Sequence, residues 1–303
     1  MDEEKRVKFN KLFNSIFSLE LNSKTKNEIL YTKEEYLEFI SLLETLEPES
    51  YKILETALKD DEILYSHSME TDDNAKKKLV ESMVDPSVRK DSIKYITDKK
   101  LINGKLTIFN IKKVHSILMT GISVDQDGNK NFRVTDDIFV GYYENNKKVI
   151  QYLPPKSHDI DFFMKEALTL LNDPEVNRME EYLFVHPAII HALIAIIQPF
   201  DDGNTRTSRV VNYSMLLDYT NKMFQKSFKL PIIYLSRSYS AFREQYRSLL
   251  ANLAIDPSNE NWNKWINFNM FMVQIYFNYA KEIIYDNNLI VKLSELALTI
   301  DKC

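Results

Sequence analysis

Glycine, proline and cysteine are scarce in this chain of 303 residues. Five glycines and nine prolines leave little material for the tight turns of an extensive β-sheet, which argues against a largely β protein. The single cysteine, Cys303, excludes an internal disulfide framework and fits a reducing compartment. No apolar run reaches the length of a membrane span, and the charged start of the chain is unlike a secretion signal. We therefore expect a cytoplasmic protein without membrane contact.

A surplus of basic residues is also absent. The formal net charge is −5 at pH 7, whereas a nucleic-acid-binding protein usually presents a basic face, so we expect no nucleic-acid partner. Apolar residues make up 44% of the chain and charged residues 27%, which is typical of globular proteins. The length is sufficient for one or two domains with a substantial core.

Apolar residues recur with the period of an α-helix along most of the chain, which predicts an all-α protein. Helices are expected over residues 34–46, 50–58, 107–119, 159–171, 187–197, 207–219, 241–252 and 263–285. Residues 138–153 differ, because two β-prone runs flank an Asn-rich turn, and they predict a β-hairpin that ends before Pro154. A lone hairpin is marginal in water, so this one must pack on the helices or on a ligand.

The most informative segment reads Gln-Pro-Phe-Asp-Asp-Gly-Asn-Thr-Arg-Thr-Ser-Arg, from Gln198 to Arg209. A long apolar run, residues 188–197, precedes it, and a second apolar run begins at Val210. This order predicts an apolar helix, a break at the proline, a Gly-Asn turn and a new helix. Backbone N–H groups of such a turn, together with the positive end of the new helix, form an anion site.

Charged side chains around this turn indicate which anion is bound. Arg206 and Arg209 are three residues apart on one face of the new helix, so both guanidinium groups can reach the same ligand. Asp202 would repel a phosphate unless a cation stood between them. Mg²⁺ is the natural cation, because proteins hold it with few carboxylates and with phosphate oxygens. The residues alone therefore predict a site for a magnesium nucleotide.

The same segment resembles the signature of the Fic family, His-Pro-Phe-x-(Asp/Glu)-Gly-Asn-(Gly/Lys)-Arg-x-x-Arg. There are two departures, because Gln198 stands where the family has its catalytic His and Thr205 stands where Gly or Lys is usual. The apolar run with His191, and the later segments 230–236 and 243–246, also resemble helices of the family. The resemblance covers residues from about 60 to about 275.

This resemblance implies a Fic-fold helical bundle with a small β-hairpin flap over the active site, where strand addition would register a target segment. It divides the chain into an N-terminal helical region with an inhibitory helix, 1–104, a Fic core, 105–250, and C-terminal helices, 251–303. Fic enzymes typically transfer AMP from ATP to a protein hydroxyl. The resemblance therefore implies ATP and Mg²⁺ as cofactors, and as partner a protein with a Ser, Thr or Tyr hydroxyl, the chain itself included. The target protein and the oligomeric state stay open, a homodimer included.

Site roles follow by position in the motif. Asp202 would hold Mg²⁺ between the α- and β-phosphates, and Phe200 would be a buried anchor for the turn. The remaining expected nucleotide contacts are Gly203, Asn204 and the backbone of Thr205 at the α-phosphate, Arg206 near the β-phosphate and Arg209 near the γ-phosphate.

Gln198 at the catalytic position allows three explanations. The family His accepts the proton of the target hydroxyl and contributes ~10²–10⁴-fold, whereas a carboxamide has no basic site near neutral pH. The chain is therefore an engineered His-to-Gln variant, a natural pseudoenzyme that binds nucleotide, or a natural enzyme with altered chemistry. Two alternatives to AMP transfer remain: a nucleotide-binding regulatory protein without transfer, and transfer of another phosphate-containing group.

A second segment, Ser-His-Ser-Met-Glu-Thr at residues 66–71, resembles the family's inhibitory sequence (Ser/Thr)-x-x-x-Glu-(Gly/Asn). Ser66 and Glu70 are one helical turn apart and face the same way. In Fic proteins of this type the Glu pairs with the second motif Arg, here Arg209, and prevents productive docking of the γ-phosphate. The resemblance therefore implies autoinhibition by Glu70.

The other histidines are not expected to replace the missing base. His186 and His191 are five residues apart and lack the four-residue spacing of helical metal ligands, and we expect His191 to be a satisfied core residue. His115 is isolated in the sequence.

Overall fold

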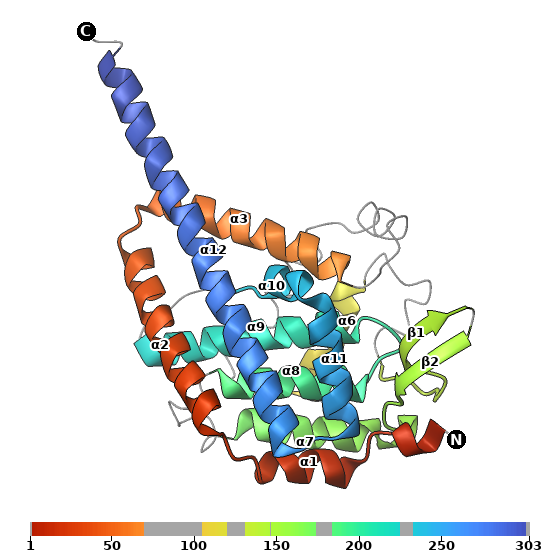
Figure 1. The fold of residues 1–303 in the computed structure, drawn as a ribbon. Helices are drawn as coiled ribbons and strands as arrows, with labels where there is room; N and C mark the ends of the chain where they lie inside the picture. The colour runs from red at the N-terminus through yellow and green to blue at the C-terminus, as the bar shows by residue number, and fades with distance from the viewer. Residues whose placement is uncertain are drawn as a thin grey trace.

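The fold is mostly helical, with one small antiparallel sheet (Figure 1). It was obtained as a computed structural model, which describes residues 2–69, 105–119, 131–145, 147–173, 184–224 and 233–300. The elements in chain order are η1 (Asp2–Lys5), α1 (Phe9–Phe17), α2 (Ser23–Glu44), α3 (Pro48–Ser68), α6 (Ile108–Leu118), β1 (Val140–Glu144), β2 (Lys147–Tyr152), η3 (Ser157–Asp159), α7 (Ile160–Asn172), α8 (Val185–Ile197), α9 (Asn204–Phe224), α10 (Ser236–Ala241), α11 (Arg243–Ile255) and α12 (Asn259–Ile300).

Helix α8 forms the centre of the core. Every residue of this helix is buried, which is expected for a helix that is apolar on all sides. It packs against α7, α9, α11 and α12, and these neighbours are seen around it in Figure 1. The end of α8 and the start of α9 are consequently fixed within the densest part of the molecule.

Helix α12 is the longest element, and it joins the two ends of the chain. It crosses the bundle and packs against α2, while its last turns project away from the body (Figure 1). The rings of Tyr36 and Phe39 on α2 stack on Phe277 of α12 with centroid distances of 5.5 and 5.2 Å. The N-terminal helices are therefore part of the same core as the central helices.

Two helix starts show how caps set the boundaries. Helix α6 begins after Thr107, whose side chain and that of Asn110 form a reciprocal capping box, as expected for a start at 107. Helix α2 begins well before the predicted residue 34, because Asn22 accepts a hydrogen bond from the Thr25 backbone. Polar residues in the first turns of α2 concealed its periodicity. Helices α3 and α12 are also longer than predicted.

The hairpin β1–β2 confirms the predicted flap. Its strands pair in antiparallel register with Gly141 opposite Ile150, and Asn145 in the turn has a positive φ of 48°. The N-terminal segment supports its base. Val7 N–H donates to the Leu153 carbonyl at 2.9 Å, and Leu153 N–H donates to the Lys5 carbonyl at 3.1 Å. The flap is thus joined to the body by the first residues of the chain, as Figure 1 shows.

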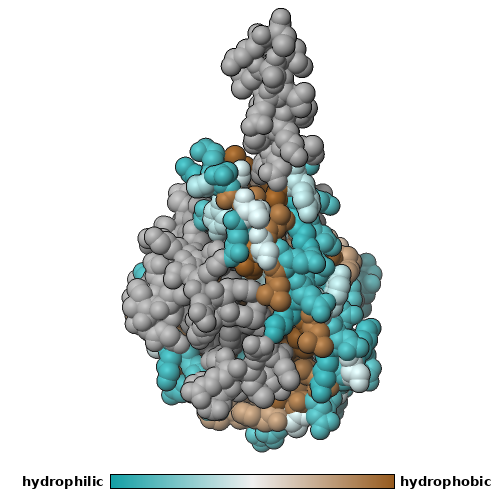
Figure 2. All heavy atoms as spheres, turned by 90° about the vertical axis from the view of Figure 1, so that its left-hand side faces the viewer, coloured by the Kyte–Doolittle hydropathy of each residue, from teal (hydrophilic) through white to brown (hydrophobic). Residues whose placement is uncertain are grey.

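The surface facing the viewer in Figure 2 carries a narrow apolar band between hydrophilic side chains. Large exposed apolar residues of the described chain include Leu30 and Leu37 on α2. Isolated apolar residues of this kind are ordinary on protein surfaces. Within the described ranges, no helix combines the length and apolar character needed to cross a bilayer.

Candidate active site

The turn between α8 and α9, residues 198–203, carries the predicted motif, and we call it the motif turn. Gln198 ends α8 in the left-handed conformation, with φ 50° and ψ 60°. Gly203 has φ +74°, and a Cβ atom there would lie 2.6 Å from the Met119 sulfur. Both the conformation and the close packing explain why glycine stands at this position. The turn delivers the N-terminus of α9 to the surface of the core, as predicted.

Asn204, the first residue of α9, holds the motif turn together. Its side-chain oxygen accepts the Phe200 N–H at 2.8 Å, and its Nδ2 donates to the Phe200 carbonyl at 2.8 Å. The same Nδ2 donates to Oε1 of Gln198 at 2.9 Å. Because the side chain is buried and committed to these bonds, only the backbone of Asn204 is left to meet a phosphate.

Phe200 is the buried anchor that the sequence predicted. Its ring stacks on the imidazole of His115 with a centroid distance of 3.6 Å and an interplanar angle of 4°. The Nε2 atom of His115 lies 2.8 Å from the Asp202 carbonyl oxygen. His115, isolated in the sequence, is therefore a structural support of the motif turn, and only its position within the predicted helix 107–119 could have indicated this.

Arg133 is a second support that sequence reasoning missed. Its backbone N–H donates to the Pro199 carbonyl at 2.9 Å, and its Nε donates to the Gln198 carbonyl at 2.9 Å. The residue is buried, and burial lowers the pKa of its guanidinium, although nearby Asp136 opposes this. No pattern around residue 133 marks it as part of the site, since it lies 65 positions before its partner.

Asp202 and Arg206 lie together, as the helical spacing predicts. Oδ2 of Asp202 accepts a hydrogen bond from Nη2 of Arg206 at 3.1 Å, and Oδ1 accepts the Gly203 N–H at 2.6 Å. The carboxylate is 66% exposed, whereas the arginine is buried. Among the described residues, no group of three or more His, Cys, Asp or Glu side chains could hold a metal. A divalent cation here would take most of its ligands from a nucleotide, with Asp202 as the available carboxylate.

Arg209 reaches the segment that is expected to be inhibitory. Its Nη2 donates to the Ser66 hydroxyl at 2.8 Å and to the Ser66 carbonyl at 3.0 Å, and its Nε lies 3.3 Å from the same hydroxyl. Ser66 is in the last turn of α3 and is buried. Ser66 of this segment thus contacts the second motif arginine. The predicted pairing of Glu70 with Arg209 stays a prediction, because Glu70 lies outside the described residues.

A hollow of about 800 Å³ opens beside the motif turn, and we call it the main hollow. Three predicted residues line it: Gln198, Thr205 and Arg209. The flap contributes both strands, α11 contributes Tyr246 and Arg247, and Met69 at the end of α3 closes one side. Asp202 and Gly203 of the motif turn, and Asn204 and Arg206 at the start of α9, are not part of this lining.

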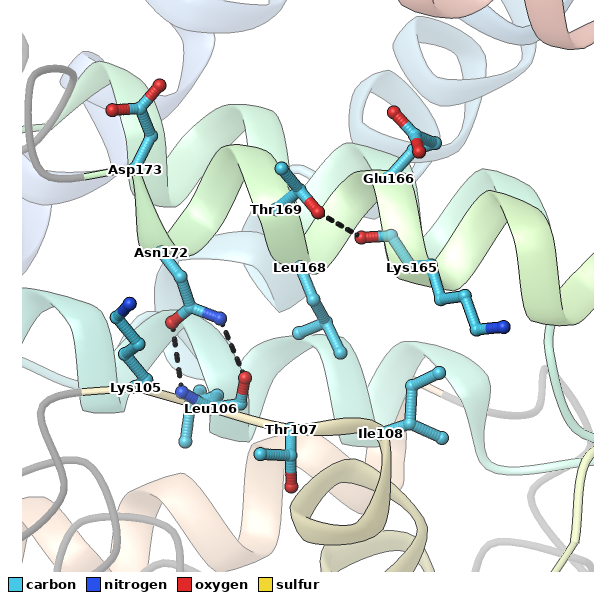
Figure 3. A pocket seen from close by; sticks show the side chains of 10 residues that line it. All are labelled: Lys105, Leu106, Thr107, Ile108, Lys165, Glu166, Leu168, Thr169, Asn172 and Asp173. Atoms are coloured by element: carbon cyan, nitrogen blue, oxygen red, sulfur yellow. Dashed lines mark hydrogen bonds between the residues drawn. The ribbon is translucent and has the colours of Figure 1, made fainter.

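A second hollow, of about 720 Å³, lies between the start of α6 and α7, away from the motif turn. Figure 3 shows its side chains, among them Lys105, Lys165 and Asp173. Asn172 spans it, since its side-chain amide exchanges two hydrogen bonds with the backbone of Leu106. This pairing holds α7 against the segment before α6. The hollow is therefore explained by the packing of these two segments.

Three buried titratable groups near the centre are kept neutral. Burial, with a smaller effect of the Arg209 charge, lowers the pKa of His191 to about 3, and burial lowers that of His186 to about 4. The ring of His191 lies 2.9 Å from the Tyr246 hydroxyl, so it is the satisfied core residue that was predicted. Burial raises the pKa of Tyr152, whose hydroxyl donates to the Ala195 carbonyl at 3.3 Å.

Comparisons with known proteins agree with this arrangement. Residues 105–216 match the model of the Fic/DOC family. The fold is similar to that of Fic-1 from C. elegans, with a TM-score of 0.61 and 14% identity over 88% of this chain and 74% of that chain. It is also similar to a Fic domain-containing signaling protein from Bacteroides thetaiotaomicron, with a TM-score of 0.60 and 15% identity over 84% of this chain and 97% of that chain. A Fic family protein from Desulfovibrio desulfuricans gives a TM-score of 0.55 at 16% identity, over 84% and 74% of the two chains.

At these identities the structural likeness bears on the fold, and the family model bears on the segment that contains the motif turn, the flap and most of α9. The mostly helical architecture and its single hairpin were both expected from the sequence. The boundaries predicted between the three regions of the chain stay a prediction. The chain contains a domain of the Fic/DOC family.

Proposed function

We propose that this protein belongs to the AMP-transferring type, which moves AMP from Mg-ATP to a hydroxyl side chain of a protein, itself included. One observation carries the proposal. The main hollow brings together the end of α8, the start of α9 with Arg209, and both strands of the flap. The helix N-terminus that we expect to bind an anion would thus face a hairpin on which a target segment could pair.

The phosphate side of the hollow suits a nucleotide. Its volume of about 800 Å³ lies in the usual range for small-molecule sites, ~300–1,000 Å³. The backbone at the start of α9 supplies N–H groups, and Arg209 supplies a guanidinium at the same end of the helix. Mg²⁺ bound with the nucleotide would neutralise charge on the phosphates. Asp202 would orient it, after exchanging its bond with Arg206 for the cation.

The hydroxyl side of the hollow lacks the histidine that serves as base in the family motif. Nε2 of Gln198 donates to the Ala195 carbonyl at 2.6 Å, and its Oε1 accepts from Asn204, so the side chain is held within the turn. No histidine is among the described residues that line the hollow. Tyr152 touches Gln198, but its raised pKa keeps the hydroxyl protonated. We therefore expect slow transfer by this chain and fast transfer only when the nucleophile arrives activated.

The decisive experiment compares the chain with its Gln198→His variant in the presence of labelled ATP and Mg²⁺. If the base is what is missing, transfer, self-modification included, should rise by at least ~10²-fold. Gln198→Asn is the matched control, because it keeps the carboxamide and adds no base. Equal labelling in all three forms contradicts a general-base role at this position.

Nucleotide binding tests the anion site separately from transfer. By calorimetry, Gln198→His should bind Mg-ATP as the original chain does, because the phosphate contacts lie elsewhere. Asp202→Ala should abolish Mg²⁺-dependent nucleotide binding, and Arg206→Ala should weaken binding by ~1.5–3 kcal/mol for a lost charged hydrogen bond. Undiminished binding by both variants rules out the anion site.

A regulatory nucleotide-binding protein is the second candidate function. The observation that favours it is the fixed position of Gln198, whose side chain acts as a structural link in the turn. On this alternative, Gln198→His binds Mg-ATP and transfers no label to any protein. Transfer of another phosphate-containing group is distinguished by the position of the label, since α-labelled ATP then leaves the protein unlabelled.

We further propose autoinhibition by α3. The contact of Ser66 with Arg209 supports this proposal, because Arg209 is the residue that we expect to bind the γ-phosphate. Glu70 and a γ-phosphate would compete for the same guanidinium. In the Gln198→His background, Glu70→Gly should therefore raise transfer while leaving ADP affinity nearly unchanged, because ADP has no γ-phosphate. Constant transfer after this substitution contradicts a regulatory role for residues 66–71.

A further inference from the structure

Arg133 is the one buried guanidinium of the described residues that bonds both the motif turn and the base of the flap. Nε donates to the Gln198 carbonyl, Nη1 donates to the Thr135 carbonyl at 2.7 Å, and Nη2 donates to the Pro155 carbonyl. Thr135 precedes the first strand of the flap, and Pro155 follows the second. Four atoms of one residue, its backbone N–H included, therefore connect three separate segments of the chain.

The bond from Arg133 to Gln198 acts at a residue with an unfavourable backbone conformation. Gln198 is in the left-handed region, which is unfavourable for a non-glycine residue, so the surrounding contacts must hold it there. Its carbonyl follows the last turn of α8, at the negative end of that helix, and the guanidinium places a positive charge against it. The planar guanidinium of arginine can donate to three carbonyls in fixed directions, whereas the single ammonium group of lysine cannot.

We propose that Arg133 is a positioning residue, which holds residue 198 and the base of the flap as one unit. This inference rests on the proposed function. On that function the flap places the target hydroxyl, and the histidine of the Gln198→His variant would receive its proton, so the flap and residue 198 must stay within hydrogen-bond reach of the same hydroxyl. Arg133 itself does not line the main hollow, and it is not expected to touch nucleotide or target.

The prediction is a separation of rate from affinity. In the Gln198→His background, Arg133→Gln should lower kcat by at least ~10-fold, since small misplacements of reacting groups have effects of this size or larger. The Kd for Mg-ATP, measured by calorimetry, should change less than about twofold, because the phosphate contacts lie on α9. The kcat of Arg133→Lys in this background should lie between that of the Gln198→His protein and that of the Arg133→Gln variant. An unchanged kcat, or a loss confined to nucleotide affinity, overturns the proposal.

Arg6 provides the matched control. It donates to the Pro154 carbonyl at 2.9 Å and so supports the flap base from outside, without reaching residue 198. Arg6→Gln should therefore lower kcat clearly less than Arg133→Gln does. If both variants have equal effects, Arg133 acts only as a support of the flap and the proposed coupling is wrong.

Hydrogen exchange tests the coupling without any transfer activity, and so separates its failure from failure of the proposed function. In the original chain, Arg133→Gln should accelerate amide exchange in the motif turn and in residues 147–155 together, with α12 unchanged. Acceleration in one segment alone contradicts the proposal. If Arg133→Gln does not fold, the same comparison is made with Arg133→Lys, whose partial loss must again appear in both segments.

Discussion

The two sides of the main hollow are fastened in different ways. On the side of the motif turn, buried side chains bond the backbone, as Asn204 and Arg133 do, and Phe200 is sealed against His115. On the side of α3, the half of the helix nearest the hollow is held by polar contacts of its side chains, and of the Ser66 carbonyl, to other elements. Glu62 accepts two bonds from Ser236, Asp61 pairs with Arg237 at 3.0 Å, and Ser66 meets Arg209.

This difference indicates which side can move. Bonds to the backbone of a tight turn last as long as the turn, so the motif side should open only when the core unfolds. We expect the end of α3 to detach first, by exchanging its polar contacts for water and exposing the buried Met69, while its apolar residues Leu54 and Leu58 keep the first half in place. A site with one permanent side and one detachable side is what regulation by a helix requires.

The largest effect is expected from removing the anchor of the permanent side. Phe200→Ala should lower the free energy of unfolding by about 3–5 kcal/mol, because a buried ring is lost and a cavity is left. Phe109→Ala is the control, since that ring is 72% exposed and should matter by less than about 0.5 kcal/mol. Denaturant titration measures both, and similar values for the two variants contradict the view that the motif side belongs to the core.

Low pH should lower the free energy of unfolding through His191, which lies on α8 next to the motif turn. The pKa of His191 is about 3 in the fold against an ordinary value of 6.5, so the unfolded chain binds more protons below pH 6.5. The contribution of His191 is therefore complete above that pH and decreases as the pH falls, by about 2 kcal/mol at pH 5.

Unfolding in denaturant at pH 7.5 and at pH 5 measures this loss, and His191→Gln should reduce it. His186, with a pKa of about 4, contributes in the same direction and is unchanged by that substitution, so it serves as the background. A loss of the same size in both proteins shows that His191 is already charged in the fold.

A smaller effect is expected at the detachable side. Ser66→Ala removes the hydroxyl that receives Arg209, and a hydrogen bond to a charged group is worth ~1.5–3 kcal/mol. Much of this should be recovered, because the Ser66 carbonyl remains as an acceptor. We expect faster amide exchange at the end of α3 with little change in global unfolding. A loss of global stability as large as that of Phe200→Ala would show that the end of α3, like the motif side, opens only when the core unfolds.

The smallest effect is expected at Arg237. Its side chain is 40% exposed and contacts Asp61 and the ring of Tyr279, 3.9 Å away. Exposed pairs of this kind contribute at most ~1 kcal/mol. Arg237→Gln should leave thermal unfolding within a few degrees of the original and speed exchange only in α3. Faster exchange in the motif turn after this change contradicts the separation of the two sides.

The sequence predicted the parts of this site that are local. The helices followed from periodicity, the flap from its Asn-rich turn, and the motif turn from Gly203 between two apolar runs. The contacts of His115, Arg133 and Glu62 could not be predicted, because each partner lies far away in the chain and no repeating pattern marks the pair. The start of α2 was missed for a local reason, since its first turns are polar and only the cap at Asn22 shows where it begins.

Contacts between the two ends of the chain have a consequence for the order of folding. The Trp262 ring donates to the Ser15 hydroxyl at 2.8 Å, and Asn22 N–H donates to the Asn263 side chain at 2.9 Å. On the ribosome, the first helices therefore emerge long before their partners on α12 exist. Contacts of such high sequence separation form slowly, so α1 and α2 must wait with their apolar faces unpaired. Chains interrupted before α12 should accordingly depend on chaperones to stay out of aggregates.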